Sequence, residues 1–151
     1  MADDSDDDFL LIEAAFRKSK LAHKLYHVPD GGRAIMYLEG VAPFHDRTKF
    51  PFPDLLILDV QMPGGNGFEV LGRLREQHHI RIPAVMFSSS NASRDIETAL
   101  RLGAADYFVK PLTLQGMAEL AKTIDQRWLR GKRPRQIEAE RPEGDAKSDR
   151  G

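Results

Sequence analysis

Three short, largely apolar runs, separated by segments of helical character, constrain the fold of this chain most strongly. The runs cover 56–60, 84–87 and 107–109, and continuous apolar stretches of this length are typical of strands covered on both faces. Because parallel strands must be joined by long crossovers, usually helices, this alternation favours right-handed βαβ connections. We therefore expect an α/β fold, a doubly wound parallel sheet with helices on both faces.

Helices are expected between and after these runs from the spacing of their apolar residues. The other expected elements are a short strand at 24–28 and helices at 9–16, 34–40, 68–77 and 94–102. Ser93 is the expected cap of the fourth of these helices. A closing helix is marked by apolar residues that recur three and four positions apart: Leu114, Met117, Ala121, Ile124 and Trp128.

The chain divides into one domain and a tail. It has 151 residues, of which 41% are hydrophobic, so a single domain can bury a core without metal or disulfide support. We place this domain at 1–130. Residues 131–151 carry many charges, prolines and glycines and almost no large apolar side chains. They cannot bury enough surface to offset the entropy of ordering, so we expect a flexible charged tail.

The composition excludes several classes of protein. Lysine and arginine number 22 against 23 acidic residues, a formal net charge of -1, which gives no whole-chain attraction to nucleic acid or an anionic membrane. The absence of cysteine excludes disulfides, thiolate metal sites and cysteine nucleophiles. No apolar run has the length of a membrane span, and the acidic N-terminus is not typical of a signal peptide. We expect a cytoplasmic protein that binds neither membrane nor nucleic acid.

Polar side chains stand at the carboxyl end of each predicted strand. Asp59, Ser88 and Lys110 occupy these positions, and ligand sites of parallel α/β sheets lie at that edge. A carboxylate, a hydroxyl and an ammonium are therefore expected to converge on one rim of the sheet. Asp3 and Asp4 would add a second carboxylate if the fold brings the N-terminus beside Asp59.

This set of groups suits phosphoryl transfer. A carboxylate can act as a nucleophile toward phosphorus, and the reaction otherwise needs alignment and neutralisation of charge. Mg²⁺ neutralises charge with one or two carboxylates and several waters, a lysine adds a mobile positive charge, and a serine donates a hydrogen bond. Each residue alone has an ordinary explanation, as a helix cap, a turn residue or a solvated charge. Their joint placement at the ends of three strands favours a phosphoryl-transfer site.

Four segments together resemble the receiver domain of two-component response regulators. They are DDSDDDFLLIEAAF at 3–16, PDLLILDVQMPGGNGFEVL at 53–71, IPAVMFSSS at 82–90 and GAADYFVKPLT at 103–113. The first is similar to the family's acidic cluster and first helix, the second to its phosphoacceptor stretch, and the last to its lysine loop. The resemblance covers roughly 2 to 129 and implies a flavodoxin-like sheet.

The resemblance implies a metal and phosphate site around one aspartate. Asp59 would be the phosphorylated residue. Asp3 and Asp59 would bind Mg²⁺ together with the backbone carbonyl of Gln61, and Asp4 is a further candidate ligand. Pro63 and Gly67 would shape the loop that follows, which is also what turn chemistry asks of such residues.

The remaining roles implied by the resemblance concern contact with the phosphoryl group and the response to it. Ser88 and Lys110 would contact the group, and Tyr107 would be the aromatic residue that turns inward on activation. For Tyr107 the ordinary reading is a half-exposed tyrosine at a strand end. The family also permits a cis bond between Lys110 and Pro111.

The start of the chain departs from the family. An apolar first strand normally precedes the acidic cluster, whereas here only Met1 and Ala2 stand before Asp3. A sheet without this strand would expose apolar faces and unpaired backbone. Either the start is placed too far downstream, or the protein is impaired or takes a strand from a partner. We favour the first explanation.

A second departure concerns the metal. Ala2 stands where the family usually has the first acid of a pair, and its methyl group cannot bind a cation. Reduced affinity for Mg²⁺ is therefore expected unless Asp4 takes that role. A Mg²⁺ titration that gave the family's ordinary affinity would contradict this expectation.

The expected function is that of a stand-alone receiver and not of an enzyme. A sensor histidine kinase would phosphorylate it. The receiver would then signal to a downstream protein by changing shape at the face of Ser88 and Tyr107. The loop at 42–53 and the ending IDQRWL at 124–129 favour the small regulators paired with phytochrome-like kinases. By family analogy, the last helix and the Tyr107 strand would form a homodimer face.

Two other functions are alternatives to this one. The missing strand and Ala2 would also fit a phosphorylation-independent interaction domain with a degenerate receiver fold. A metal-dependent phosphatase or nucleotide-binding enzyme is disfavoured, because the glycine-rich segment at 62–67 lacks the lysine and the spacing of a phosphate-binding loop.

Overall fold

The computed structural model describes residues 1–130 and contains a parallel sheet. Within these residues the sheet has three named strands in the order β1 (Leu56–Leu58), β2 (Ala84–Ser88) and β3 (Asp106–Val109). The predicted parallel α/β fold is confirmed. The charged tail predicted for 131–151 lies outside the described residues. No helix in the described part is both long and apolar enough to cross a bilayer.

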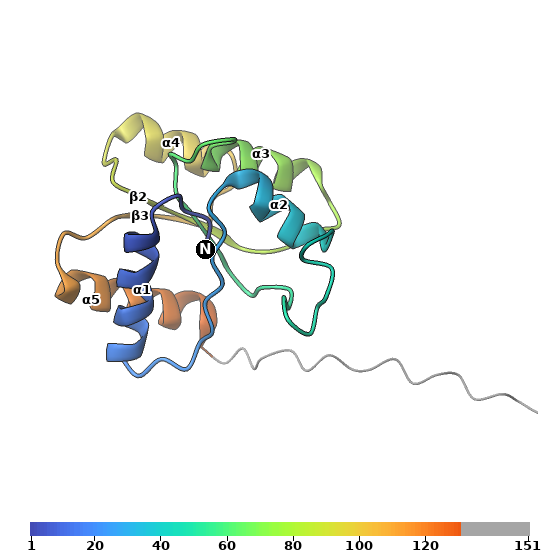
Figure 1. Ribbon diagram of the computed structural model, residues 1–151. Helices are drawn as coiled ribbons and strands as arrows, with labels where there is room; N and C mark the ends of the chain where they lie inside the picture. The colour runs from blue at the N-terminus through green and yellow to red at the C-terminus, as the bar shows by residue number, and fades with distance from the viewer. Residues whose placement is uncertain (131–151) are drawn as a thin grey trace, which may run out of the picture.

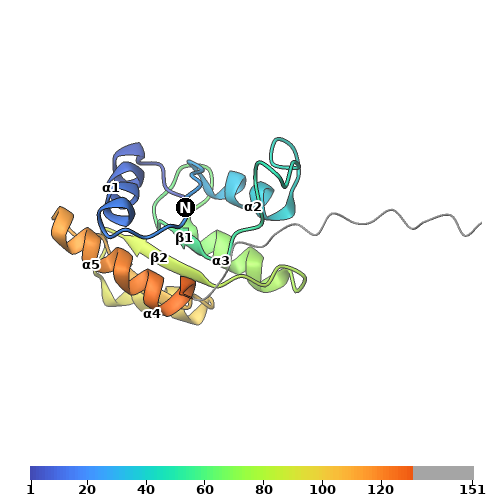
Figure 2. The same ribbon diagram turned by 90° about the horizontal axis from the view of Figure 1, so that it is seen from below.

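The N-terminal segment adds a single parallel bridge to the sheet, beside β1. Ala2 pairs in parallel with Val28 on one side and with Leu58 on the other. Its amide donates to the Ile57 carbonyl (2.8 Å), and its carbonyl accepts from the Asp59 amide (2.9 Å). This places the N-terminus beside β1, between the first two helices (Figure 2). The strand expected at 24–28 is correspondingly reduced to its last residue.

Five α-helices surround the sheet in the described residues: α1 (Asp6–Lys18), α2 (Gly31–Glu39), α3 (Gly67–Glu76), α4 (Ser93–Arg101) and α5 (Leu114–Ile124), which continues as a π-helical segment η1 (Asp125–Leu129). Side-chain caps begin four of them, at Ser5, Asp30, Asn66 and Thr113. The cap predicted at Ser93 is wrong. Ala92 is the N-cap and makes no side-chain cap bond, because Ser93 already has helical geometry.

Two apolar clusters cover the two faces of the sheet, because successive strand residues point to opposite sides. Ile57, Val85 and Phe87 pack with α1 and α5. Leu58 and Met86 pack on the other side with α2, α3 and part of α4. Figure 1 shows α1 and α5 on one side of the strands and the other three helices opposite. Helices on both faces make the fold doubly wound, as the sequence predicts.

The long loop between α2 and β1 is tied to the end of α2 by Arg47. Its guanidinium donates to the carbonyls of Tyr37 (2.7 Å), Leu38 (2.8 Å) and Phe50 (3.2 Å), so one side chain joins the last turn of α2 to the loop. The cis bond found in the described residues lies in this loop, before Pro43, and not at Lys110–Pro111.

Candidate phosphoryl and metal site

The predicted site residues meet at one edge of the sheet. Asp59 directly follows β1, Ser88 ends β2, and Lys110 directly follows β3. Asp3 and Asp4 reach the same edge because the Ala2 bridge carries the chain out between Val28 and β1. Parallel strands thus bring together groups that lie far apart in the sequence.

Three carboxylates form a compact cluster at this edge. One oxygen each from Asp3, Asp4 and Asp59 lies within 4.8 Å of the others. The Asp3 side chain is fully buried and Asp59 is 7% exposed, whereas Asp4 is exposed to solvent. The Ser5 amide donates to Asp3 Oδ1 (2.9 Å) and fixes that carboxylate. Such oxygen ligands suit a hard cation such as Mg²⁺.

Lys110 holds three of the carboxylates on this rim. Its Nζ lies 2.8 Å from Asp3 Oδ2, 2.8 Å from Asp8 Oδ2 and 3.0 Å from Asp59 Oδ2. The lysine side chain is only 9% exposed, so these ion pairs are little screened by water. The sequence reasoning missed Asp8. The available signal was its place in the acidic run at 3–8, of which only Asp3 and Asp4 were expected to bind the metal.

The pKa values follow from this burial and pairing. Burial raises the pKa of Asp59; the hydrogen bond and charge of Lys110 oppose this rise, and the neighbouring charge of Asp3 adds to it. Burial alone would lower the pKa of Lys110, but pairing with the carboxylates of Asp3, Asp8 and Asp59 outweighs this effect, and the pKa lies above its ordinary value. The lysine therefore stays charged at neutral pH.

Ser90 links the two residues predicted to respond to phosphate. Ser88 is 2% exposed, and its Oγ accepts from the Ser90 amide (3.2 Å). Tyr107 is half-buried, and its hydroxyl donates to the Ser90 carbonyl (2.8 Å). In the segment after β2, Ser90 is therefore hydrogen-bonded to the side chains of both Ser88 and Tyr107. The sequence offered no reason to single out Ser90 from its neighbours.

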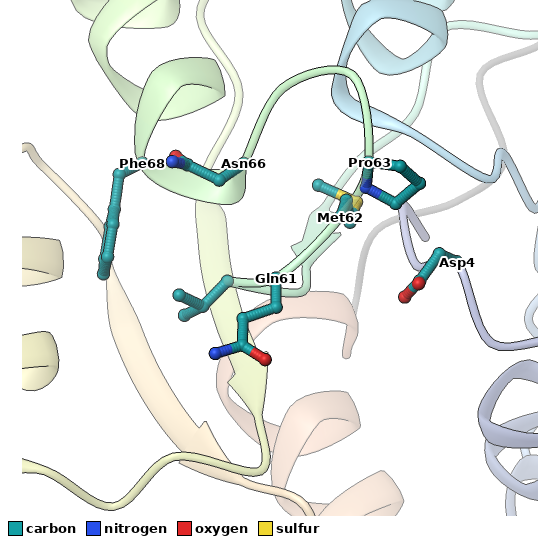
Figure 3. A pocket seen from close by; sticks show the side chains of 7 residues that line it. Asp4, Gln61, Met62, Pro63, Asn66 and Phe68 are labelled. Atoms are coloured by element: carbon teal, nitrogen blue, oxygen red, sulfur yellow. The ribbon is translucent and has the colours of Figure 1, made fainter.

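Gln61 borders the cluster and a pocket beside it. Its amide donates to Asp59 Oδ1 over 3.4 Å. The pocket is open to solvent, and side chains from the N-terminal segment, the loop after β1 and the first turn of α3 line it (Figure 3): Asp4, Val60, Gln61, Met62, Pro63, Asn66 and Phe68. Metal binding by the Gln61 carbonyl stays a prediction.

Gly67 allows the loop after Asp59 to turn back closely on the site. Its amide donates to the Val60 carbonyl (3.1 Å). A Cβ at this position would collide with the Asp59 carbonyl and lie 2.7 Å from Met86 Cε. The glycine predicted to shape this loop thus has a steric reason, the close approach of α3 to the residue after β1.

Comparisons with known proteins agree with the geometry. A model of the response regulator receiver domain matches residues 1–123. A response regulator in red light signaling of R. palustris has 28% sequence identity and a TM-score of 0.82, with 89% of this chain and 96% of that chain covered. The phosphorylated cyanobacterial phytochrome response regulator RcpA has 29% identity and a TM-score of 0.77, with 87% and 93% covered.

Response regulator Rcp1 of Synechocystis is a third relative. It is 26% identical over 130 residues, which are 85% of this chain and 86% of the relative. The Mn²⁺-bound structure of a response regulator Rcp1 has 25% identity and a TM-score of 0.75, with 89% of this chain and 96% of that chain covered. The expected likeness to small phytochrome-associated regulators is confirmed.

Proposed function

Because this chain belongs to the response regulator receiver domain family, we propose that it accepts a phosphoryl group on Asp59 from a histidine kinase and signals by changing conformation. One observation carries the proposal. The nearly buried Asp59 carboxylate stands between two further carboxylates and the Lys110 ammonium, at the carboxyl edge of a parallel sheet. The likeness to phytochrome response regulators supports a phytochrome-class kinase as the donor.

The donor set fits a divalent cation. Four carboxylates, those of Asp3, Asp4, Asp8 and Asp59, lie on this rim against the single positive charge of Lys110. Asp3 and Asp59 would hold Mg²⁺, with Asp4 as the exposed third carboxylate. The ion would neutralise negative charge on the transferring phosphoryl oxygens. Because Ala2 supplies no carboxylate, we expect the affinity of the site for Mg²⁺ to depend on Asp4.

The proposed reaction uses Asp59 as the nucleophile. A carboxylate oxygen of Asp59 attacks the phosphorus, the phosphorus–nitrogen bond to the donor histidine breaks, and the imidazole leaves with the electron pair. Lys110 can move toward the phosphoryl oxygens and offset their charge, because its long side chain keeps a mobile ammonium at the site. The Ser88 hydroxyl would donate a hydrogen bond to one of these oxygens.

The proposed response starts at Ser88. If its hydroxyl turns to the phosphoryl group, the bond from the Ser90 amide is strained or lost, and the Ser90 carbonyl that holds Tyr107 moves with it. The shape of the β2–α4 loop and the position of Tyr107 would then report phosphorylation to a downstream protein. In this proposal the protein is a phosphoryl acceptor and not an enzyme that turns over a substrate of its own.

A phosphorylation-independent interaction domain is the second candidate. Buried Ala2, which replaces an acid expected from the resemblance, favours it. The two candidates differ in Asp59→Asn, which keeps the shape of the side chain and removes the nucleophile. Binding to a partner that is unchanged in this variant, with and without a phosphoryl donor, would support the second candidate.

Incubation with acetyl phosphate tests the first candidate. With Mg²⁺ present, intact-protein mass spectrometry should show one added phosphoryl group, and both EDTA and Asp59→Asn should prevent it. Asp7→Asn is the matched control, because Asp7 is an exposed aspartate of α1 outside the metal cluster. An unmodified wild-type protein in Mg²⁺, or full modification of Asp59→Asn, would overturn the proposal.

A further inference from the structure

Asp8 is the one partner of Lys110 that the proposed chemistry does not use. A lysine ammonium has three N–H donors, and three carboxylates lie within 3.0 Å of Nζ: Asp3, Asp8 and Asp59. Nζ donates hydrogen bonds to Asp8 and Asp59, and it lies at ion-pair distance from Asp3. A new anionic group on Asp59 must therefore compete with these carboxylates for the ammonium.

Asp8 is the contact best placed to give way. Asp3 and Asp59 belong to the cluster that fits a cation, and Asp8 does not. Its side chain is 30% exposed, compared with 0% for Asp3 and 9% for Asp59. Water can therefore solvate the Asp8 carboxylate after release, whereas a released Asp3 carboxylate would be left buried and unpaired, at a much higher cost in free energy.

The position of Asp8 is fixed by the start of α1. The Asp8 amide donates to Ser5 Oγ (3.2 Å), which caps this helix. Ser5 also donates through its own amide to Asp3. The same turn thus orients one carboxylate toward the metal cluster and another toward Lys110. The contact between Asp8 and Lys110 is part of an ordered turn and not a chance meeting of two long side chains.

Resting on the function proposed above, we propose that Asp8 is a positioning residue that competes with the phosphoryl group for the Lys110 ammonium. In the unphosphorylated protein Asp8 holds one of the three donors of Lys110. In the phosphorylated protein that donor turns to a phosphoryl oxygen and Asp8 faces water. The Asp8 carboxylate thereby lowers the affinity of the site for a phosphoryl group.

The competition has an electrostatic signature. The Asp8 carboxylate attracts a cation at the neighbouring cluster and repels an anion on Asp59. Removal of its charge therefore weakens the binding of Mg²⁺ alone and strengthens the binding of a phosphoryl analogue. A residue that merely stabilises α1 would change both affinities in the same direction or neither, because misfolding damages the whole site.

Two titrations of Asp8→Asn test the proposal, each followed through backbone amide NMR signals. The first adds Mg²⁺ alone, and the second adds beryllofluoride, an analogue of the phosphoryl group, at saturating Mg²⁺. We expect Mg²⁺ affinity to fall and beryllofluoride affinity to rise, each by about three- to tenfold for the loss of one nearby charge. Asp7→Asn is the control, because it removes an equal charge from the same helix turn.

The outcomes separate this proposal from the function on which it rests. Three results together support the proposal. In Asp8→Asn the affinities for Mg²⁺ and beryllofluoride shift in opposite directions, and in Asp7→Asn both shift little. In Asp8→Glu both affinities stay near those of the wild type. The proposal is overturned if Asp8→Asn and Asp7→Asn have equal affinities, or if both affinities of Asp8→Asn shift in the same direction. The proposed function still stands in that case, provided that the wild type binds beryllofluoride. A wild type that binds no beryllofluoride in Mg²⁺ overturns both.

Discussion

At the scale of single residues, Gly67 has little freedom to change. A methyl group there would meet the carbonyl of Asp59, the proposed phosphoacceptor. We expect Gly67→Ala to lower the free energy of unfolding by about 2 kcal/mol or more, as overpacking against backbone does, and to slow phosphorylation by acetyl phosphate. Urea unfolding and the rate of mass gain measure the two effects.

Gly72 provides the matched control for that substitution. It lies in the same helix, and a Cβ there would meet nothing within 4 Å. Gly72→Ala should stabilise the protein by about 0.5–1 kcal/mol, because alanine favours helix over glycine, with no change in phosphorylation. Equal effects of the two substitutions would show that the close approach at Gly67 is not a constraint.

Tyr37 gives a pH dependence far from the site. Burial chiefly, and then the neighbouring Tyr26, raise the pKa of its phenol from 10.0 to about 12, against the opposing charge of Arg47. The unfolded chain therefore ionises Tyr37 first, and the free energy of unfolding should fall as pH rises from about 10 to about 12. In Tyr37→Phe this fall should be smaller by about 1 kcal/mol or more. Denaturant titrations across this range compare the two, and parallel curves would contradict the expectation.

The site residues that stand at strand ends could be predicted from the sequence. Asp59, Ser88 and Lys110 end up on one rim because each stands at the end of a strand, a relation that apolar runs reveal. Asp8 and Ser90 were missed because their contacts depend on how a helix start and a loop are turned in space. One-dimensional spacing carries little of that information.

At the scale of elements, Arg47 connects the end of α2 to the loop before β1. Its donation to three carbonyl groups cannot be replaced by a lysine, which lacks the rigid fork of a guanidinium. We expect both Arg47→Met and Arg47→Lys to lower the free energy of unfolding by about 2 kcal/mol. Chemical denaturation measures the change.

Arg33 is the control for Arg47, because it also belongs to the α2 region but forms an exposed ion pair with Asp30. Arg33→Met should cost about 0.5 kcal/mol or less, the usual value of a surface pair. A cost for Arg47→Met no larger than that of Arg33→Met would mean that the long loop does not depend on its guanidinium.

The elements themselves were predicted better than their ends. The five helices and the three strands exist where apolar periodicity placed them, with bounds that differ by a few residues. The strand at 24–28 shrank to one bridge at Val28 because its neighbour in the sheet is the single residue Ala2. The predicted Ser93 cap is wrong because α4 begins one residue earlier than expected, with Ala92 as its N-cap, and propensity does not predict a cap without a side-chain acceptor.

At the scale of the whole molecule, the acidic rim should couple folding to a metal. A cation that binds only the folded state stabilises it by mass action, by about 2.7 kcal/mol at one hundred times the dissociation constant. We expect Mg²⁺ to raise the melting temperature of the wild type by several degrees relative to EDTA. Asp3→Asn should abolish this increase and Asp4→Asn should reduce it.

The Asp7→Asn variant is the reference for these metal effects, since it keeps the cluster of Asp3, Asp4 and Asp59 intact. Its melting temperature should respond to Mg²⁺ as the wild type does. An equal response in Asp3→Asn would show that the cation binds elsewhere on the acidic N-terminal turn.

The position of the modified carboxylate is the decisive property of the proposed phosphoacceptor site. After reaction with acetyl phosphate and Mg²⁺, borohydride reduces an aspartyl phosphate to homoserine, and tandem mass spectrometry of the peptides locates it. We expect homoserine at position 59 and nowhere else in the acidic rim. Modification at Asp3, Asp4 or Asp8 in place of Asp59, or no reducible phosphate in any peptide, would contradict this expectation.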